Sequence, residues 1–246
     1  MNKFYNLMSI AFFAVLGICF ISCSDDDKDD NGGGVDKTPI SLFAGREKAI
    51  EGAKTIDSSD KFVAYSKDNI VYGYHVGSAT LSVNGKYKIP VSVLPMYNLY
   101  DDPVCEWGCN IANVKSKQKQ GTLSSKSTSE MLTYENAGGA TLLGYSFKDG
   151  KLSAAMAIVS TNHTSTLASF LAERYMMIPV YEGEETYFAG IDAIDTDHAK
   201  TIAIMNLYNT DYWWVYYTDY KASTRSVTNY DEMKELKESL IPLLAK

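Results

Sequence analysis

No stretch of the sequence matches a known catalytic motif. It contains no Gly-x-Ser-x-Gly nucleophile elbow, no His-Glu-x-x-His metal motif and no phosphate-binding loop. The three histidines, His75, His163 and His198, are widely separated. Two carboxylates opposed across a cleft can hydrolyse a glycosidic bond, but the glutamates of segment 182–185 fall in a predicted hairpin turn, where they face water. We therefore expect a protein that is not an enzyme, and a polysaccharide hydrolase is the least favoured function.

The densest polar cluster lies in one loop and contains Asp192, Asp195, Asp197 and His198. Aspartates this close together can bind Ca²⁺ through their oxygens. The loop lacks the glycine and the distal glutamate of a helix-loop-helix calcium site. A solvated turn between two strands is therefore the better interpretation, and we expect neither a metal nor a cofactor.

Two cysteines, Cys105 and Cys109, lie close together in the middle of the chain. No further Cys or His pair lies near them to complete a zinc site. Three residues separate them, whereas a redox motif has two. An exported chain meets an oxidising compartment, so two interpretations stay open: a local disulfide or two buried thiols.

An aromatic strand is predicted at Tyr212–Tyr217. Alternation along a strand places Trp213 and Tyr217 on one face and Trp214 and Tyr216 on the other. If a helix covers one face, the other is exposed and can stack on sugar rings or anchor a protein partner. These four residues are the predicted ligand-binding site. The alternative is that aromatic residues simply favour strands and that both faces are covered.

The N-terminal stretch has the composition of a secretory leader, residues 1–22. Lys3 precedes an apolar run from Leu7 to Ile21, which is short for a membrane-spanning helix. The tetrapeptide that ends at Cys23 resembles a lipobox, which implies that the Cys23 thiol is acylated before the leader is cut. Each buried methylene contributes about 0.8 kcal/mol, so several acyl chains such as palmitate hold a soluble domain on a membrane.

An acidic run, Ser24, Asp25, Asp26 and Asp27 followed by further aspartates and glycines, comes directly after the lipobox. It resembles the export signal of surface lipoproteins of Bacteroidota and implies a lipid-anchored protein on the outer face of the outer membrane. A run of like charges is also a solvated spacer, in which case the protein faces the periplasm. In both cases residues 23–36 form a disordered tether.

Without the leader, the 246-residue chain keeps 224 residues, enough for one large domain or two small ones. The formal net charge of the whole chain is -7, and loss of Lys3 makes it -8. An acidic protein is a poor partner for nucleic acid. The only membrane attachment that we expect is the lipid.

The segment 37–96 contains short strands separated by turn signals, of which Asn84-Gly85 predicts a tight hairpin. Strands are predicted at 40–43, 61–65, 70–72, 79–83 and 87–93. Ser58-Ser59-Asp60, Val63-Ala64, Gly73, the run 76–81 and Val91-Ser92-Val93 resemble a bacterial Ig-like domain of group 2. The resemblance implies an Ig-like β-sandwich that serves as a spacer without chemistry of its own.

The segment 97–246 has the pattern of an α+β domain. A helix with Trp107, Ile111 and Val114 on one face precedes three strands, and a helix over 167–175 precedes three or four more. A last helix, 230–241, carries Met233, Leu236 and Leu240 on one stripe and is expected to pack on the body of the chain. The predicted fold is therefore mostly β: an Ig-like sandwich followed by antiparallel meander sheets with packed helices.

The sequence thus predicts a non-catalytic, lipid-anchored cell-surface protein in which an Ig-like spacer presents an α+β head that binds a protein or a glycan. The alternative is a structural or assembly accessory that faces the periplasm.

Overall fold

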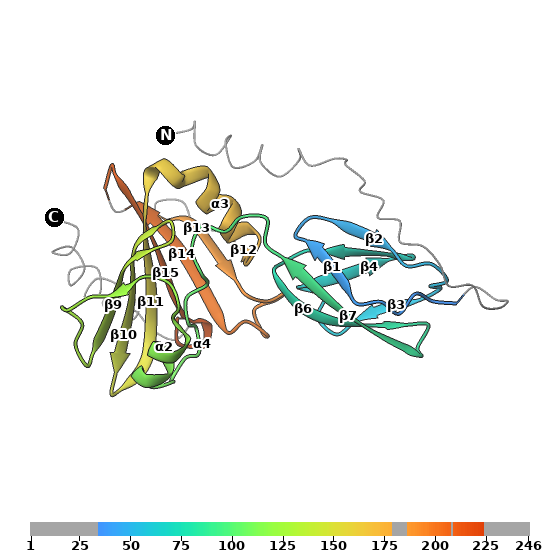
Figure 1. Cartoon of the computed structure of the whole chain (residues 1–246), viewed down its shortest axis with the longest axis horizontal. Helices are drawn as coiled ribbons and strands as arrows, with labels where there is room; N and C mark the ends of the chain where they lie inside the picture. The colour runs from blue at the N-terminus through green and yellow to red at the C-terminus, as the bar shows by residue number, and fades with distance from the viewer. Residues whose placement is uncertain (1–33, 179–185, 208, 224–246) are drawn as a thin grey trace. The chain divides into compact units, whose positions relative to one another are not determined.

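The structure, a computed structural model, describes residues 34–178, 186–207 and 209–223. The chain forms two compact units, which divide between Leu94 and Pro95. The predicted boundary lies two residues later. Each unit is described by itself below, with the first in blue to teal and the second in green to red in Figure 1.

The first unit is a β-sandwich of a four-stranded and a three-stranded sheet, with strand orders β1-β7-β6-β3 and β2-β5-β4 (Figure 1). All neighbours are antiparallel except β1 and β7, which run parallel with Ile40 beside Val91 and Phe43 beside Leu94. The strands are β1 (Ile40–Phe43), β2 (Glu47–Ala49), β3 (Ile56–Ser58), β4 (Ala64–Lys67), β5 (Ile70–Gly73), β6 (Gly77–Val83) and β7 (Tyr87–Leu94). The expected mostly β sandwich is confirmed.

The core of the sandwich follows from the period-2 alternation of its strands. In β6 and β7 every second side chain is buried, so that Leu81 and Ile89 lie inside and Thr80 and Lys88 lie outside. The opposite sheet contributes Val71 to the same interior. Each sheet therefore keeps an outer face that carries polar or aromatic side chains.

The predicted hairpin between β6 and β7 is confirmed. Asn84 and Gly85 both have positive φ angles, 53° and 65°, which the tight turn requires. Asn84 also braces a neighbouring loop, because its side-chain oxygen accepts the N–H groups of Lys54 and Thr55. The asparagine therefore fixes both the turn and the approach to β3.

The predicted strand over 61–65 is wrong in its first half. The Asp60 carboxylate accepts the N–H groups of Phe62 and Val63, and Ala64 N–H donates to the Asp60 carbonyl. These bonds turn the chain, and β4 begins only at Ala64. Strands β2 and β3 are short and were not predicted.

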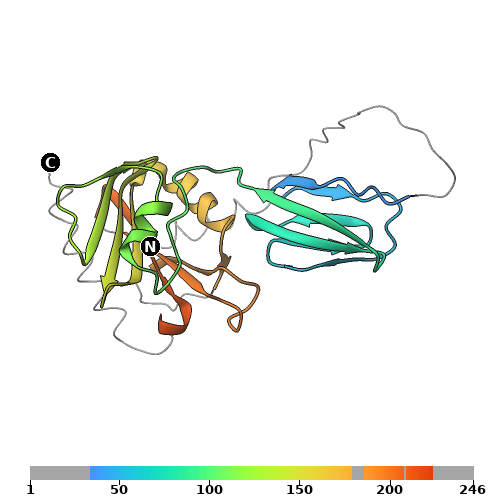
Figure 2. The ribbon, with the colours of Figure 1, turned by 60° about the horizontal axis from the view of Figure 1, so that its bottom comes forward.

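The second unit contains one antiparallel sheet of eight strands in the order β12-β13-β14-β15-β11-β10-β9-β8. Figure 2 shows this unit in green to red. The strands are β8 (Thr122–Leu123), β9 (Met131–Ala137), β10 (Ala140–Lys148), β11 (Lys151–Ser160), β12 (Met176–Met177), β13 (Thr186–Ile191), β14 (Thr201–Leu207) and β15 (Tyr212–Asp219). The helices are α2 (Ile111–Lys117), η1 (Thr161–His163), α3 (Thr164–Ala172) and α4 (Tyr220–Ser223). This is the predicted α+β arrangement.

The second unit repeats one pattern twice. Helix α2 precedes the meander β8–β11, and helix α3 precedes the meander β12–β15; each meander opens with a two-residue strand. The two meanders join where β11 pairs with β15, with Ala157 opposite Val215. The repetition expected from the sequence pattern is thus present in the fold.

The two faces of this sheet differ in what the described elements place on them. The helix-covered face carries Tyr145 and Tyr217, and α2, α3 and segment 97–121 lie over it. The face on the opposite side, called the second face, carries Leu142, Met156 and Trp214. No helix of the described residues is long and apolar enough to cross a bilayer.

Candidate functional site

The strand predicted to expose aromatic rings, β15, is buried. Trp213 is 4% exposed, Trp214 2%, Tyr216 1% and Tyr217 0%. The prediction that these four residues form an exposed ligand-binding face is therefore corrected: β15 lies in the middle of the sheet, between β14 and β11. Its side chains form part of the core on both faces.

The burial of the helix-covered side of β15 has a clear structural cause. Trp213 donates its indole N–H to the Thr164 hydroxyl at the start of α3, at 2.7 Å. The hydroxyls of Tyr217 and Tyr100 are 2.7 Å apart, and the Tyr100 ring contacts Phe170. Burial raises the pKa of both tyrosines, so the hydroxyls stay protonated and can share this bond.

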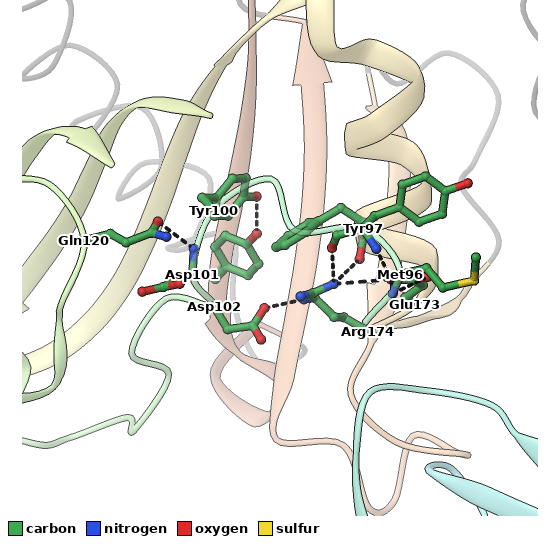
Figure 3. Close-up of polar contacts among 10 residues, drawn as sticks. Met96, Tyr97, Tyr100, Asp101, Asp102, Gln120, Glu173 and Arg174 are labelled. Atoms are coloured by element: carbon green, nitrogen blue, oxygen red, sulfur yellow. Dashed lines mark hydrogen bonds and ion pairs between the residues drawn. The ribbon is translucent and has the colours of Figure 1, made fainter. Parts of the chain in front are cut away.

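A dense set of polar contacts surrounds Arg174, just after α3 (Figure 3). The guanidinium donates to the Asp102 carboxylate at 2.5 Å and to the Phe170 and Tyr97 carbonyls. It also lies 3.7 Å from the centre of the Phe170 ring. Only 8% of its side chain is exposed, so this cation is fully engaged by the protein.

The neighbouring Glu173 holds the first residues of the second unit. Its carboxylate accepts the N–H groups of Met96 and Tyr97 at 3.1–3.2 Å (Figure 3). Burial raises the pKa of Glu173, and these two hydrogen bonds oppose that rise. Glu173 and Arg174 together tie segment 96–102 to the end of α3, so the cluster positions the chain.

Cys105 and Cys109 are free thiols in the structure. The local disulfide, one of the two interpretations that the sequence left open, is therefore not formed in it. Burial raises the pKa of Cys105, and the nearby Asp102 and Asp192 raise it further. A protonated thiol is a poor nucleophile. Cys109 lies in the turn before α2, where Asn110 caps the helix by accepting the N–H of Asn113. The predicted helix therefore starts at Ile111 and excludes Trp107.

The loop of aspartates uses its oxygens for its own backbone. Asp192 accepts the N–H groups of Lys200 and Thr201. Asp195 accepts those of Asp197 and His198, and contacts the His198 ring at 2.6 Å. Among the described residues, no group of three or more His, Cys, Asp or Glu side chains is arranged to hold a metal ion. The geometry is that of a hydrogen-bonded turn.

Exposed aromatic rings do gather elsewhere, on the outer face of the three-stranded sheet in the first unit. We call Tyr65, Tyr72 and Tyr74 the tyrosine face. Tyr65 and Tyr72 are directly opposite on β4 and β5, with stacked rings 4.9 Å apart. Tyr74 meets Tyr65 edge to face at 6.0 Å. Tyr65 is 39% exposed and Tyr74 45%.

The backbone next to Tyr74 is fixed by a buried histidine. His75 stacks on Phe62 at 4.0 Å and contacts Tyr74 edge to face at 4.3 Å. Its Nδ1 lies 2.9 Å from the Phe62 carbonyl, which can only accept, so Nδ1 carries the proton and donates. The signal for this surface in the sequence is alternation: Tyr65 and Tyr72 follow the buried Ala64 and Val71, so their side chains point to the outer face.

A shallow polar depression lies on the other sheet of the sandwich. Its lining consists of Asp57, Ser58, Ser59, Thr80, Ser82 and Lys88. Two of these hydroxyls already bond within the chain: Ser58 donates to the Asp60 carbonyl, and Ser59 accepts the Thr80 N–H. The depression lacks an aromatic ring, so the tyrosine face is the stronger candidate.

The remaining predicted site residues, Cys23 and the run Ser24 to Asp27, lie outside the described residues, as do the glutamates of 182–185 and the helix predicted over 230–241.

No family model and no curated protein matches the chain. Among solved structures, one of the surface layer protein SbsC, domains 4–9, matches with 14% sequence identity and a TM-score of 0.20. The match covers 77% of this chain and 27% of that chain. A TM-score of this size carries no argument about fold or function, so the resemblance to group 2 Ig-like domains stays a prediction.

Proposed function

We propose that this protein is a non-catalytic, lipid-anchored protein of the cell surface that binds a glycan through the tyrosine face of its sandwich. The observation that carries the binding proposal is the exposure of Tyr65 and Tyr74 beside the stacked Tyr72. The site proposed from the sequence, on β15, is replaced by this one. The Ig-like unit is then the binding module as well as a spacer.

The chemistry of the tyrosine face favours a sugar over a protein partner. Tyrosine rings pack against the C–H face of a pyranose, and their hydroxyls hydrogen-bond to sugar hydroxyls. A stable protein interface takes about 20–30 residues on each side, whereas the tyrosine face has three. The stacking also fixes the rings before a ligand arrives, which lowers the entropic cost of binding.

A polysaccharide affinity gel tests the binding proposal. The chain without residues 1–23, which keeps both described units, is run through gels that contain neutral and acidic polysaccharides. We expect at least one gel to retard the wild type. Tyr65→Ala and Tyr74→Ala together are expected to weaken this binding by about tenfold or more. Tyr87→Ala is the matched control, because Tyr87 lies in the same unit and its ring contacts Lys37 and Lys86. Equal retardation of the double variant and the control would reject the tyrosine face.

The lipid anchor and the side of the membrane need separate experiments. Labelling of cells with a palmitate analogue is expected to mark the wild type and not Cys23→Ala. External protease on intact cells is expected to cut the wild type. A protein that is labelled but left uncut supports the alternative, a structural or assembly accessory facing the periplasm.

A further inference from the structure

The second face of the eight-stranded sheet carries a cluster of buried apolar and aromatic side chains. Its cluster consists of Leu142, Ala154, Met156, Ile158, Trp214 and Tyr216, with Met131 and Tyr212 packed against it. Each of the six cluster residues is at most 3% exposed. All eight side chains come from β9, β10, β11 and β15, which are neighbouring strands of one layer.

One layer of strands cannot bury a tryptophan on its own surface. Side chains stand roughly perpendicular to a sheet, so a second layer about 10 Å away has to exclude water from them. Within the described residues, α2 and α3 lie on the opposite, helix-covered face and contribute nothing to the cluster. The layer over Trp214 and Met156 therefore comes from another part of the chain or from another molecule.

The described chain leaves the sheet on this same side. After β15, Tyr220 packs against a second apolar cluster that includes Ile191 and Ile202, next to Ile204. Ile202 and Ile204 lie opposite Thr218 and Tyr216, and so belong to the second face. Tyr220 N–H donates to the Lys200 carbonyl at 2.9 Å, which fixes the direction of exit.

The 23 residues that follow Ser223 have the composition and length of a covering helix. The helix predicted over 230–241 carries Met233, Leu236 and Leu240 on one stripe, with the charged Glu235, Lys237 and Glu238 away from it. Twelve helical residues span about 18 Å, and four neighbouring strands span about 14 Å. One such helix can therefore cross the whole cluster.

We propose that residues 224–246 of the same chain dock on the second face, with the stripe of Met233, Leu236 and Leu240 facing Met156, Ile158 and Trp214. The second unit then has three layers: helices and segment 97–121, the sheet, and the C-terminal segment. This surface is an internal docking site, and it is independent of the glycan-binding proposal.

Photocrosslinking in the folded chain without residues 1–23 tests the proposal directly. A benzophenone amino acid replaces Leu236 in one variant and Lys237 in a matched control. With Leu236 replaced, we expect adducts within the same chain that map to β10, β11 or β15. The control is expected to give few or none of these adducts. Adducts in residues 34–94, or a band of twice the mass that shows a second copy on the face, would overturn the proposal.

Hydrogen exchange gives a second readout that does not depend on a crosslink. Leu236→Asp with Leu240→Asp is expected to speed amide exchange in β11 and β15 by about tenfold or more, since the opened state becomes more populated. Glu235→Gln with Glu238→Gln changes the charged side of the same helix and is expected to leave exchange unchanged. Equal exchange in both variants would mean that the apolar stripe does not cover the sheet.

Discussion

The chain carries two groups of aromatic residues on strands, and their surroundings differ. The tyrosine face of the sandwich leaves Tyr65 and Tyr74 about two fifths exposed. Trp213, Trp214, Tyr216 and Tyr217 of β15 are at most 4% exposed. Aromatic residues therefore lie on or next to strands in both units, so the composition of a strand does not decide which rings reach solvent. The number of layers that pack on the sheet does.

This difference explains where a ligand can bind. A two-layer sandwich buries one face of each sheet and leaves the other to solvent, so Tyr65 and Tyr72 are displayed. In the second unit, helices cover one face of the sheet, and the cluster on the second face is also buried from solvent. Aromatic residues there stabilise the fold, whereas those of the sandwich are available for recognition.

The largest expected effect is the difference between truncating a buried ring of β15 and truncating an exposed ring of the tyrosine face. Trp214→Ala leaves a large cavity in the cluster on the second face and is expected to destabilise the second unit by about 3–5 kcal/mol. Tyr65→Ala removes an exposed ring and is expected to cost about 1 kcal/mol or less. Urea denaturation followed by circular dichroism measures both. Similar losses for the two variants would contradict the contrast.

The next effect concerns what keeps the cover in place over β15. Arg174→Ala leaves the Asp102 carboxylate and two carbonyls without their donor, and is expected to cost about 2–4 kcal/mol. Lys117→Ala is the control, because the Lys117–Glu106 pair is 48% and 55% exposed and such pairs contribute about 0–1 kcal/mol. Thermal denaturation of the two variants compares them. If Lys117→Ala loses as much stability as Arg174→Ala does, burial of the ion pair does not decide its contribution.

A smaller effect is expected at the hydroxyl pair below that cover. Tyr217→Phe leaves the buried Tyr100 hydroxyl without this partner and is expected to cost about 1–3 kcal/mol. Replacing both tyrosines by phenylalanine removes the unpaired group, so the double variant is expected to be more stable than Tyr217→Phe. A double-mutant cycle in urea measures the coupling. Strictly additive losses would show that the two hydroxyls do not interact.

The smallest effect is a pH dependence at Glu173. Burial raises its folded-state pKa above the unfolded value, so its contribution to stability is fully present below the unfolded pKa, about 4.3, and is lost as pH rises through the folded pKa. Between about pH 4 and pH 7, the wild type is therefore expected to lose more stability than Glu173→Gln. Urea midpoints at several pH values measure this. A steeper loss in the variant would contradict the assignment.

Local chemistry made part of the fold predictable from the sequence. Asn84-Gly85 specifies its turn, and β1 begins and ends at the predicted residues, Ile40 and Phe43. Predictions failed where a side chain competes for the backbone, as Asp60 does before β4. The exposure of β15 was not predictable, because the place of a strand in its sheet depends on pairings between residues far apart in the chain. The tyrosine face was not predicted, because the stacking of Tyr65 on Tyr72 depends on the register in which β4 pairs with β5.

The parallel pairing of β1 with β7 has a mechanical consequence for a domain held by its N-terminus. The chain enters the sandwich at Ile40, beside Val91, and leaves at Leu94, beside Phe43. Tension between an anchor before β1 and a load after β7 therefore pulls the two strands past each other along their length. All the hydrogen bonds between them are loaded together in shear, rather than one at a time as in an opening zipper. Forced unfolding is governed by the unfolding rate rather than by equilibrium stability, so this geometry suits the sandwich to bear force applied between its two ends.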